Sequence, residues 1–398
     1  MQLEYDIQDL SLASSERDEA LAWLREHDPV HWDAKNDFWL VTRHADVIEV
    51  SKDPSLFSSV PKGPWHAFDG SGISIQALDG KEHLAKRRIV SGLFTPRMVR
   101  RLEALAYRVI EEAIDAVLPQ GGCDFVDSLA VPVPMRVIAE MVGVEGHDLE
   151  RFRRWSDEMM FASDRAHPEA ASARQADAMA SFMALFGEEI ADRRRAPRDD
   201  ILTGLVQAAD EGHLRQAPDS EKLGDDELRF FGPFLILAGN ETTRHAIAHG
   251  MLALFEHPEQ FARLQADPSL VATAADEILR WTTIVRAMRR VAMADTELGG
   301  KRIRAGESVV MVYASANRDA AVFEDPFAFK VDRSPNDHIA LGIGPHYCLG
   351  ANLARMEIRV VFERVLARLP NLRLEPGTQP VATEHSVVRA VEKMPVVF

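Results

Sequence analysis

Among its 398 residues the chain has only two cysteines, Cys123 and Cys348. This scarcity excludes a disulfide framework and a zinc site built from four cysteines. Positive charge is also in deficit, because 46 lysines and arginines stand against 62 acidic residues, a formal net charge of −16. Binding a polyanion requires a basic footprint, so no nucleic-acid partner is expected.

Long apolar runs are missing as well. The N-terminus has neither the basic nor the apolar segment of a signal peptide. No stretch approaches the roughly 18 apolar residues that a membrane-spanning helix needs. We therefore expect no membrane insertion and a cytoplasmic monomer. Phosphate-binding glycine motifs are absent too, because the GIG of Gly342 to Gly344 is not GxGxxG and no Walker loop occurs.

What the chain does contain predicts one globular domain. Apolar residues make up 46% and charged residues 27%, which is typical of a folded protein. Residues 225–256 predict a helix of about 30 residues, roughly 45 Å long, with a kink or a late start at Gly232-Pro233. Periodicity predicts other helices at 16–27, 99–118, from 138 into the 190s and from Cys348 to about 369, and strands at 30–32, 38–42 and within 298–312. No repeat or linker divides residues 1–398, so we expect a single domain, mainly α with a small β portion.

The most specific local pattern is the segment from Leu341 to Gly350, which places Cys348 in a glycine-rich turn directly before a predicted helix. Backbone N–H groups of such a turn and the helix N-terminus favour the thiolate. Glycines let the backbone pass close to a flat ligand. These are properties of an axial haem thiolate. An isolated cysteine is more often a buried structural residue, so the interpretation depends on other patterns in the chain.

Three further patterns favour haem. Glu277 and Arg280 lie three positions apart on one predicted helical face, where they can form an ion pair. The string AGNETT at residues 238–243 places a glycine and two threonines inside the long helix, where their helix propensity is poor and a threonine can bond back to a carbonyl. His83 and Arg87 share a helical face and can meet a carboxylate.

In this order and at these separations, the segments resemble the cytochrome P450 family of haem-thiolate monooxygenases, along nearly the whole chain. The cysteine loop resembles F-G-x-G-x-H-x-C-x-G, with Leu341 in place of the aromatic residue, and AGNETT resembles A-G-x-[DE]-T-[TS]. The resemblance implies the single-domain P450 fold, with haem b between the long distal helix and the proximal cysteine loop. It also implies insertion of one oxygen atom from O2 into a C–H bond of a lipophilic substrate.

The resemblance also implies roles for individual residues. Cys348 would be the axial ligand of the haem iron, and Glu241 and Thr242 would form the acid–alcohol pair that relays protons on the distal side. Glu277, Arg280 and Arg333 would hold the proximal side together without reacting. The residues expected to contact haem, several of them as partners of its propionates, are His83, Arg87, Arg290, His338, His346, Ala238, Gly239, Leu341, Gly342 and Gly350.

Glu241, His245 and His249 are three possible metal ligands that follow i, i+4, i+8 spacing on the predicted helix. HExxH is absent, and over two turns these positions drift around the helix. We therefore do not expect a metal ion there.

Electrons are expected from a ferredoxin and its ferredoxin reductase, because the chain shows no flavin or nicotinamide site. A set of basic residues offers an acidic ferredoxin a docking surface despite the net charge, although each member is equally well explained as ordinary helix surface. The set comprises Lys86, Arg88, Arg97, Arg100, Arg101, Arg355 and Arg359.

The sequence determines the substrate less closely than it determines the type of reaction. Strings such as GNETTRH, EILRWT and EKMPVVF resemble the mycobacterial branch that oxidises the side-chain end of cholesterol and cholest-4-en-3-one, which implies hydroxylation of a steroid side chain or a branched aliphatic chain. Terpenoid or fatty-acid hydroxylation is the alternative, and a peroxide-using or ligand-binding haem-thiolate protein is the alternative of another class. The expected pocket walls are apolar residues, each of which can also be core: Trp65, Phe68, Ile73, Ile75, Met159, Met160, Leu235, Val285, Ala287, Met288, Val387 and Val388.

Overall fold

The computed structural model describes residues 14–63, 75–93, 95–161, 168–211, 225–384 and 388–398. The expectation of a mainly helical protein with a small β portion is confirmed. The helices are α1 (Ser14–His27), α2 (His44–Lys52), α3 (Gly80–Leu93), α4 (Pro96–Val117), α5 (Pro132–Val142), α6 (Leu149–Phe161), α7 (Pro168–Arg195), α8 (Ile201–Asp210), α9 (Asp225–Glu256), α10 (Pro258–Ala266), α11 (Val271–Thr282), α12 (Tyr313–Ala316) and α13 (Ala351–Arg368).

Short strands form four small sheets in the described part. The strands are β1 (Val30–Asp33), β2 (Phe38–Val41), β3 (Phe57–Ser58), β4 (Gly122–Asp124), β5 (Met288–Ala292), β6 (Thr296–Leu298), β7 (Lys301–Ile303), β8 (Ser308–Met311), β9 (Arg373–Leu374), β10 (Val381–Glu384), β11 (Arg389–Lys393) and β12 (Pro395–Val397). The largest sheet has the order β1-β2-β8-β5-β3, in which β2 and β8 run parallel and the other neighbours run antiparallel.

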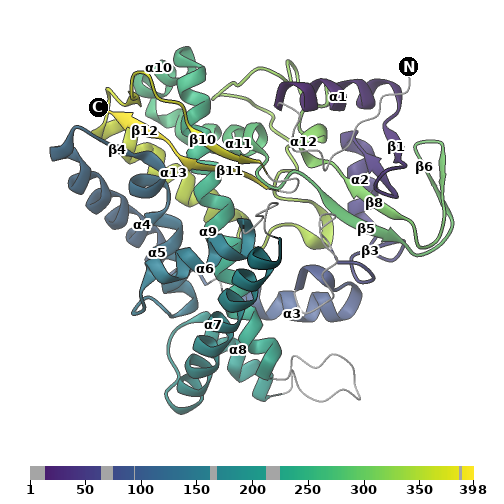
Figure 1. Cartoon of the computed structure of the whole chain (residues 1–398), viewed down its shortest axis with the longest axis horizontal. Helices are drawn as coiled ribbons and strands as arrows, with labels where there is room; N and C mark the ends of the chain where they lie inside the picture. Colours follow the sequence, from purple (N-terminus) through teal and green to yellow (C-terminus); the bar gives the residue numbers. More distant parts are fainter. Residues whose placement is uncertain (1–13, 64–74, 94, 162–167, 212–224, 385–387) are drawn as a thin grey trace.

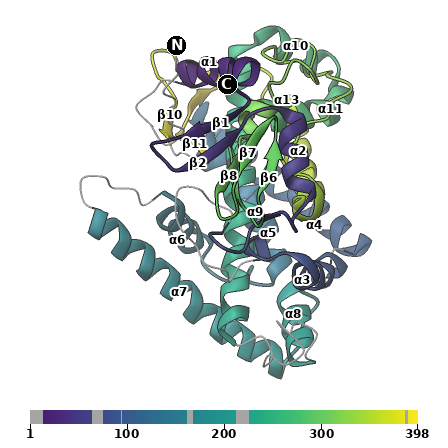
Figure 2. The same cartoon turned by 90° about the vertical axis from the view of Figure 1, so that its right-hand side faces the viewer.

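The long helix α9 runs through the middle of the molecule, with α10 at one end and α7 and α8 at the other (Figures 1 and 2), and the largest sheet lies to one side of it in Figure 1. It packs against α5, α7 and α11. Its fully buried side chains include Ile236, Ile247, Met251 and Leu254. A helix enclosed in this way is apolar on several faces, and burial rather than intrinsic propensity stabilises it.

The start of α9 corrects one sequence-based expectation. The helix begins at Asp225 and continues through Pro233, so of the kink or late start expected at Gly232-Pro233 the late start is wrong, and the kink stays a prediction. A Cβ at Gly232 would lie 1.9 Å from the ring of Phe186 on α7, so the absence of a side chain there lets the two helices approach closely. The apolar contact with α7 stabilises the turn in which proline removes a backbone donor.

Three sequence elements meet where the sheet approaches the helices. The cysteine loop precedes α13, β5 brings Arg290, and α3 brings His83 and Arg87. In the described ranges, no helix is both long enough and apolar enough to cross a membrane.

Candidate haem-thiolate site

The segment from Leu341 to Gly350 turns tightly so that Cys348 comes directly before α13. The backbone N–H of Cys348 donates to the carbonyl of Leu341 at 2.8 Å. Gly342 and Gly344 have φ angles of 71° and 72°, in the left-handed region that favours glycine. A Cβ at Gly344 would lie 2.8 Å from the carbonyl oxygen of Ser51, so α2 leaves no room for a side chain. Both glycines are therefore required by this turn.

The thiol of Cys348 lies deep in the protein but keeps part of its surface accessible. Burial raises its pKa, whereas the backbone N–H of Gly350, which donates to the sulfur, and the positive charges of Arg87 and Arg355 act in the opposite direction. A donor and two cations around a sulfur atom stabilise its anionic form. Burial has the larger effect and raises the pKa of Cys348 overall, so the donor and the cations support a thiolate that a bound metal ion would stabilise further.

Two histidines stack beside this loop. The rings of His83 on α3 and His346 have centroids 4.1 Å apart, and His346 Nε2 lies 2.9 Å from Asp79 Oδ1. Asp79 is held in turn by the hydroxyl of Ser58 and the backbone N–H of Ser59, both at 2.7 Å. Burial lowers the pKa of His83 to about 4, and the charges of His346 and Arg87 act in the same direction.

Two arginines complete this cationic group. Arg87, one turn after His83 on α3, donates to the carbonyl of Tyr347 at 2.5 Å. Arg290 on β5 is 4% exposed, and burial lowers its pKa. As well as burial, the positive charge of Arg290 lowers the pKa of both His83 and His346. The structure therefore brings together four side chains that the sequence predicted as haem contacts: His83, Arg87, Arg290 and His346.

His338 has different surroundings. Its Nε2 lies 3.1 Å from Asp276 Oδ1, and its Nδ1 accepts from the backbone N–H of Ala340 at 3.3 Å. Asp276 also accepts from Arg355 Nε at 2.6 Å. Because both ring nitrogens of His338 have partners within the protein, a propionate contact would require one of these bonds to open.

The middle of α9 presents small residues to an accessible space. Ala238 is exposed, and Gly239 and Thr242 are half-buried, although other elements enclose this helix. The hydroxyl of Thr242 donates to the carbonyl of Ala238 at 2.8 Å, as expected for a threonine that bonds back one turn. A Cβ at Gly239 would lie 2.8 Å from Ile138 Cδ1 of α5, so this glycine also permits a close helix contact.

Glu241 points away from that accessible face into a buried polar network. Its side chain is 1% exposed, and its oxygens accept from Asn240 Nδ2 at 2.8 Å and from Arg244 Nη2 at 2.6 Å. The same Arg244 nitrogen binds Asp157 of α6. Burial raises the pKa of Glu241, and Arg244 opposes that shift. Glu241 and Thr242 are therefore adjacent in sequence but face different sides of α9.

Glu277 lies at the centre of a fully buried ion network. Its two oxygens accept from Arg280 Nε and Nη2 at 2.7 and 2.8 Å, and one of them also accepts from Arg333 Nε at 3.0 Å. Arg280 Nη1 donates to the carbonyls of Asn317 and Pro326, both at 2.9 Å. The network joins α11 to the loop before the cysteine segment, because two guanidinium groups bridge a helix and irregular backbone.

These residues fit haem b on the chemistry of their donors. A thiol with a backbone donor suits iron, and a group of arginines and histidines suits two carboxylates. His83 Nδ1 is buried and has no hydrogen-bond partner among the described residues, as expected for a donor meant for a ligand. Cys348 would hold the iron, and His83, Arg87, Arg290 and His346 would hold the propionates.

The chain matches the cytochrome P450 family over residues 30–396 and belongs to it. It is accordingly a haem b monooxygenase that takes a lipophilic substrate and O2. A steroid C26-monooxygenase of Mycolicibacterium smegmatis is 39% identical over 374 residues, covering 89% of this chain and 84% of the relative. A steroid C26-monooxygenase of Mycobacterium tuberculosis is 38% identical over 389 residues, covering 97% and 94%.

Solved structures agree on the fold. A Mycobacterium marinum cytochrome P450 in complex with pseudoionone has a TM-score of 0.89 at 34% identity, with all of both chains covered. A Bacillus megaterium cytochrome P450 in complex with testosterone has a TM-score of 0.86 at 32% identity, covering 97% of this chain and 99% of that chain.

The residues expected to line the substrate pocket fall into different places. Trp65, Phe68, Ile73 and Val387 lie outside the described residues, as does the side chain of Met160. Ile75, Met159, Val285 and Met288 are half-buried, while Leu235 and Val388 are buried in the main core. Ala287 is 0% exposed and packs with Leu21 and Leu24 of α1 in a smaller core cluster.

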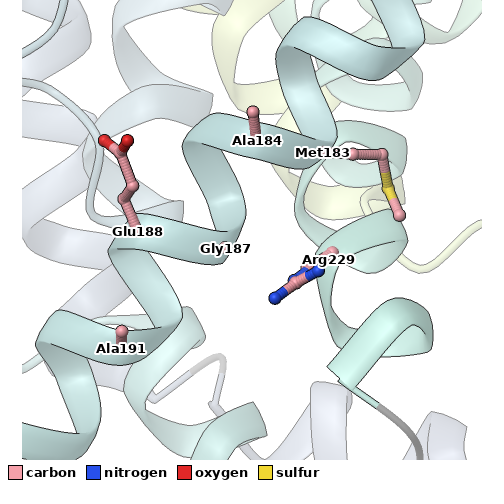
Figure 3. Close-up of a pocket in the computed structure, with 6 residues that line it drawn as sticks. All are labelled: Met183, Ala184, Gly187, Glu188, Ala191 and Arg229. Carbon is pink, nitrogen blue, oxygen red and sulfur yellow. The ribbon is translucent and has the colours of Figure 1, made fainter.

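A groove of about 400 Å³ lies elsewhere, between α7 and the start of α9 (Figure 3). Arg229 points from α9 toward α7, where a Cβ at Gly187 would lie 3.1 Å from its Nε. None of the predicted site residues lines it. The groove is therefore not part of the haem-thiolate site; its lining residues are Met183, Ala184, Gly187, Glu188, Ala191 and Arg229.

Sequence reasoning did not identify three of the acids that organise the site. Asp79 holds His346, Asp157 shares Arg244 with Glu241, and Asp276 shares its oxygen between His338 and Arg355. Arg244 alone carried a local signal, because it lies three positions after Glu241. The acids carried none, since each is distant in sequence from the residue it holds.

Proposed function

We propose that this monooxygenase hydroxylates the end of a steroid side chain or of a similarly branched aliphatic chain. The observation that carries the proposal is the similarity to steroid C26-monooxygenases along nearly the full length of the chain. The likeness to a P450 structure in complex with testosterone supports the same substrate class. The accessible face of α9 carries the small residues Ala238 and Gly239 beside Thr242, whose hydroxyl is bonded to the Ala238 carbonyl, which suits a largely apolar ligand.

When bound, haem supplies the iron that binds and activates O2. The protein's part begins with Cys348, whose anionic sulfur is stabilised by the N–H of Gly350. Thr242 donates to the Ala238 carbonyl, so its oxygen lone pairs remain able to accept from a water that carries a proton. Glu241, buried with a raised pKa and held by Arg244, supplies the acid that recharges that water once the ion pair opens.

The substrate proposal is tested by adding cholest-4-en-3-one to the purified ferric protein and following the Soret band. We expect a saturable shift to shorter wavelength, because a sterol next to the iron displaces water. A terpenoid and a long-chain fatty acid serve as matched lipophilic controls. A shift with either control and none with the sterol would contradict the steroid assignment and favour the alternative class of hydroxylase.

Thr242→Ala is expected to uncouple electron consumption from product formation. Without the hydroxyl the proton-carrying water is misplaced, so the ratio of product to NADH consumed should fall by roughly tenfold. Thr243→Ala is the matched control, because Thr243 is the adjacent threonine and is buried away from the accessible face at 4% exposure. Equal coupling in both variants would favour a protein that uses peroxide directly.

We also propose an acidic ferredoxin, reduced by its own reductase, as the electron donor. Of the predicted basic set, Arg355 and Arg359 are engaged with Asp276 and Glu103, and Lys86 is buried beside Glu82. Three members of the set are exposed and have no ion-pair partner in the described ranges. Arg88 lies in the second half of α3, and Arg97 and Arg100 lie at the start of α4. Their exposed positive charge is available to an acidic partner.

Reversing the charge of these three residues together, to glutamate, should raise the KM for ferredoxin by about tenfold at low salt. The turnover number at saturating ferredoxin should change little, because the residues steer the encounter. Arg195→Glu on α7, whose side chain is 72% exposed, is the control. The same KM increase in the control would point to net charge rather than to a docking surface.

A further inference from the structure

Arg244 on α9 bonds two carboxylates through a single nitrogen. Its Nη2 donates to Glu241 Oε2 at 2.6 Å and also to Asp157 Oδ1 on α6. That nitrogen carries two hydrogens, so it can donate one to each carboxylate at the same time. The side chains of Arg244 and Glu241 are 4% and 1% exposed, whereas that of Asp157 is 40% exposed. The buried ion pair is therefore joined directly to a half-exposed acid.

A buried guanidinium requires a counterion. Burial lowers the pKa of Arg244, but the charges of Glu241 and Asp157 outweigh this effect, so the pKa lies above its usual value and Arg244 stays a cation. If Glu241 were its only carboxylate, each protonation of Glu241 would leave a buried cation uncompensated, which is strongly unfavourable. Because Asp157 is bonded to the same nitrogen, Arg244 keeps a counterion and no side chain has to move.

Of the two acids, Glu241 is the one that takes up the proton. Burial raises its pKa, and its side chain has almost no contact with water. Burial also raises the pKa of Asp157, but Arg244 opposes this shift, and Arg153, whose Nε lies 3.8 Å from Asp157 Oδ2, opposes it as a second cation. A carboxylate that keeps water and two cations beside it remains ionised more easily than an enclosed one.

We propose that Asp157 is a positioning residue for Glu241: it holds Arg244 through a second bond and remains the counterion of that arginine while Glu241 carries a proton. The proposal rests on the proposed function, because a distal acid must take up and release a proton in each turnover. When Glu241 gains the proton it loses its charge, and Asp157 then matches the charge of Arg244. When Glu241 passes the proton to water, both carboxylates again share the guanidinium.

Titratable groups around Glu241 come from its own helix and from two neighbouring elements. Burial raises the pKa of Glu241, while Arg244 on α9 and Arg153 on α6 lower it. His245, one turn along α9, is neutral, because burial and the charge of Arg244 bring its pKa well below the usual value. Glu392 on β11 acts on His245 in the opposite direction.

The sign of the expected effect follows from the repulsion between the two acids. The charge of Glu241 contributes to the raised pKa of Asp157, after the larger effects of burial and Arg244. This repulsion is mutual, so the charge of Asp157 favours the protonated form of Glu241. Removing that charge must lower the pKa of Glu241. The acid would then stay ionised to a lower pH and hold Arg244 alone.

The test titrates Glu241 in the haem-loaded protein through the infrared C=O band of its protonated form, identified by its loss in Glu241→Gln. Asp157→Asn removes the charge and keeps the shape of the side chain. The midpoint of the Glu241 titration should move down by about one pH unit. The pH above which electron consumption is no longer coupled to product should move down by the same amount. Asp157→Glu, which restores a carboxylate, should reverse most of both shifts.

Glu158→Gln is the matched control. Glu158 is the next residue on α6, its side chain is 33% exposed, and it pairs with Arg174 of α7 at 3.1 Å. This variant removes one negative charge and one ion pair between helices but does not touch Arg244, so the Glu241 midpoint should not move. An equal shift in the control would mean that the charge or attachment of α6 is responsible, and would overturn the proposal.

A Glu241 midpoint that stays in place or rises in Asp157→Asn would also overturn the proposal, as would a shift that Asp157→Glu does not reverse. If Asp157→Asn does not fold, Asp157→Ser takes its place, because a half-exposed position tolerates a small polar side chain. Failure of the proposed function is a separate result: Glu241→Gln would leave coupling unchanged at every pH, while the infrared shift in Asp157→Asn would remain.

Discussion

Cys348→Ser is expected to abolish oxygen insertion, with turnover at least about a thousandfold lower, which corresponds to roughly 4 kcal/mol of activation barrier. A serine hydroxyl lacks the anionic sulfur whose electron density favours O–O cleavage. The measurement is product formation together with the absorption spectrum of the reduced protein under CO. The red-shifted band typical of thiolate ligation should disappear, although the small side-chain change should leave the loop folded.

The chain contains its own control for this experiment. Cys123 on β4 is the other cysteine, and burial raises its pKa to about 11, so it stays a protonated thiol. Cys123→Ser should retain both the CO band and turnover. Should Cys348→Ser keep the red-shifted band, Cys348 would not be the ligand and the assignment of the site would fail.

Glu277→Gln is expected to destabilise the protein by about 3–5 kcal/mol, because it removes the anion from a buried network and leaves two guanidinium groups uncompensated. Arg280 and Arg333 both bond the carboxylate, and Glu277 is 0% exposed. The loss should be measured by denaturant unfolding of the haem-loaded protein. Haem retention should fall as well, because the network supports the loop that leads to Cys348.

Asp332→Asn provides the comparison for Glu277→Gln. Asp332 pairs with Arg263 on the surface, where each side chain is 44% exposed, so breaking this pair should cost about 1 kcal/mol or less. Similar losses in the two variants would mean that the buried network contributes no more than a surface pair, contrary to its proposed structural role.

Local patterns predicted several elements correctly. The helix expected at 225–256 has those bounds, and the strand pair around residue 35 forms with Val30 opposite Val41. The helix after Cys348 ends at Arg368, one residue from the expected end. These elements could be predicted because apolar periodicity and turn residues act over short separations.

Of the kink or late start expected at Gly232-Pro233, the late start was wrong for a reason that is not local. Phe186, more than forty positions earlier, packs where a Cβ of Gly232 would be, and this contact belongs to the structure of the α7–α9 pair. Ala287, an expected pocket residue, is buried by the packing of α1 on the sheet, and its role in the pocket stays a prediction. Tertiary contacts decided both positions.

By itself the sequence determined the family, the cysteine loop, the distal helix and the pairing of Glu277 with Arg280, because each is carried by residues close together in the chain. Only the tertiary structure decided which acids hold the site: Asp79 against His346, Asp276 against His338, and Asp157 against Arg244. It also decided that the backbone N–H of Val391 on β11 donates to Nδ1 of His245 on α9. A hydrogen bond between residues more than a hundred positions apart leaves no local pattern, since folding alone brings its two groups together.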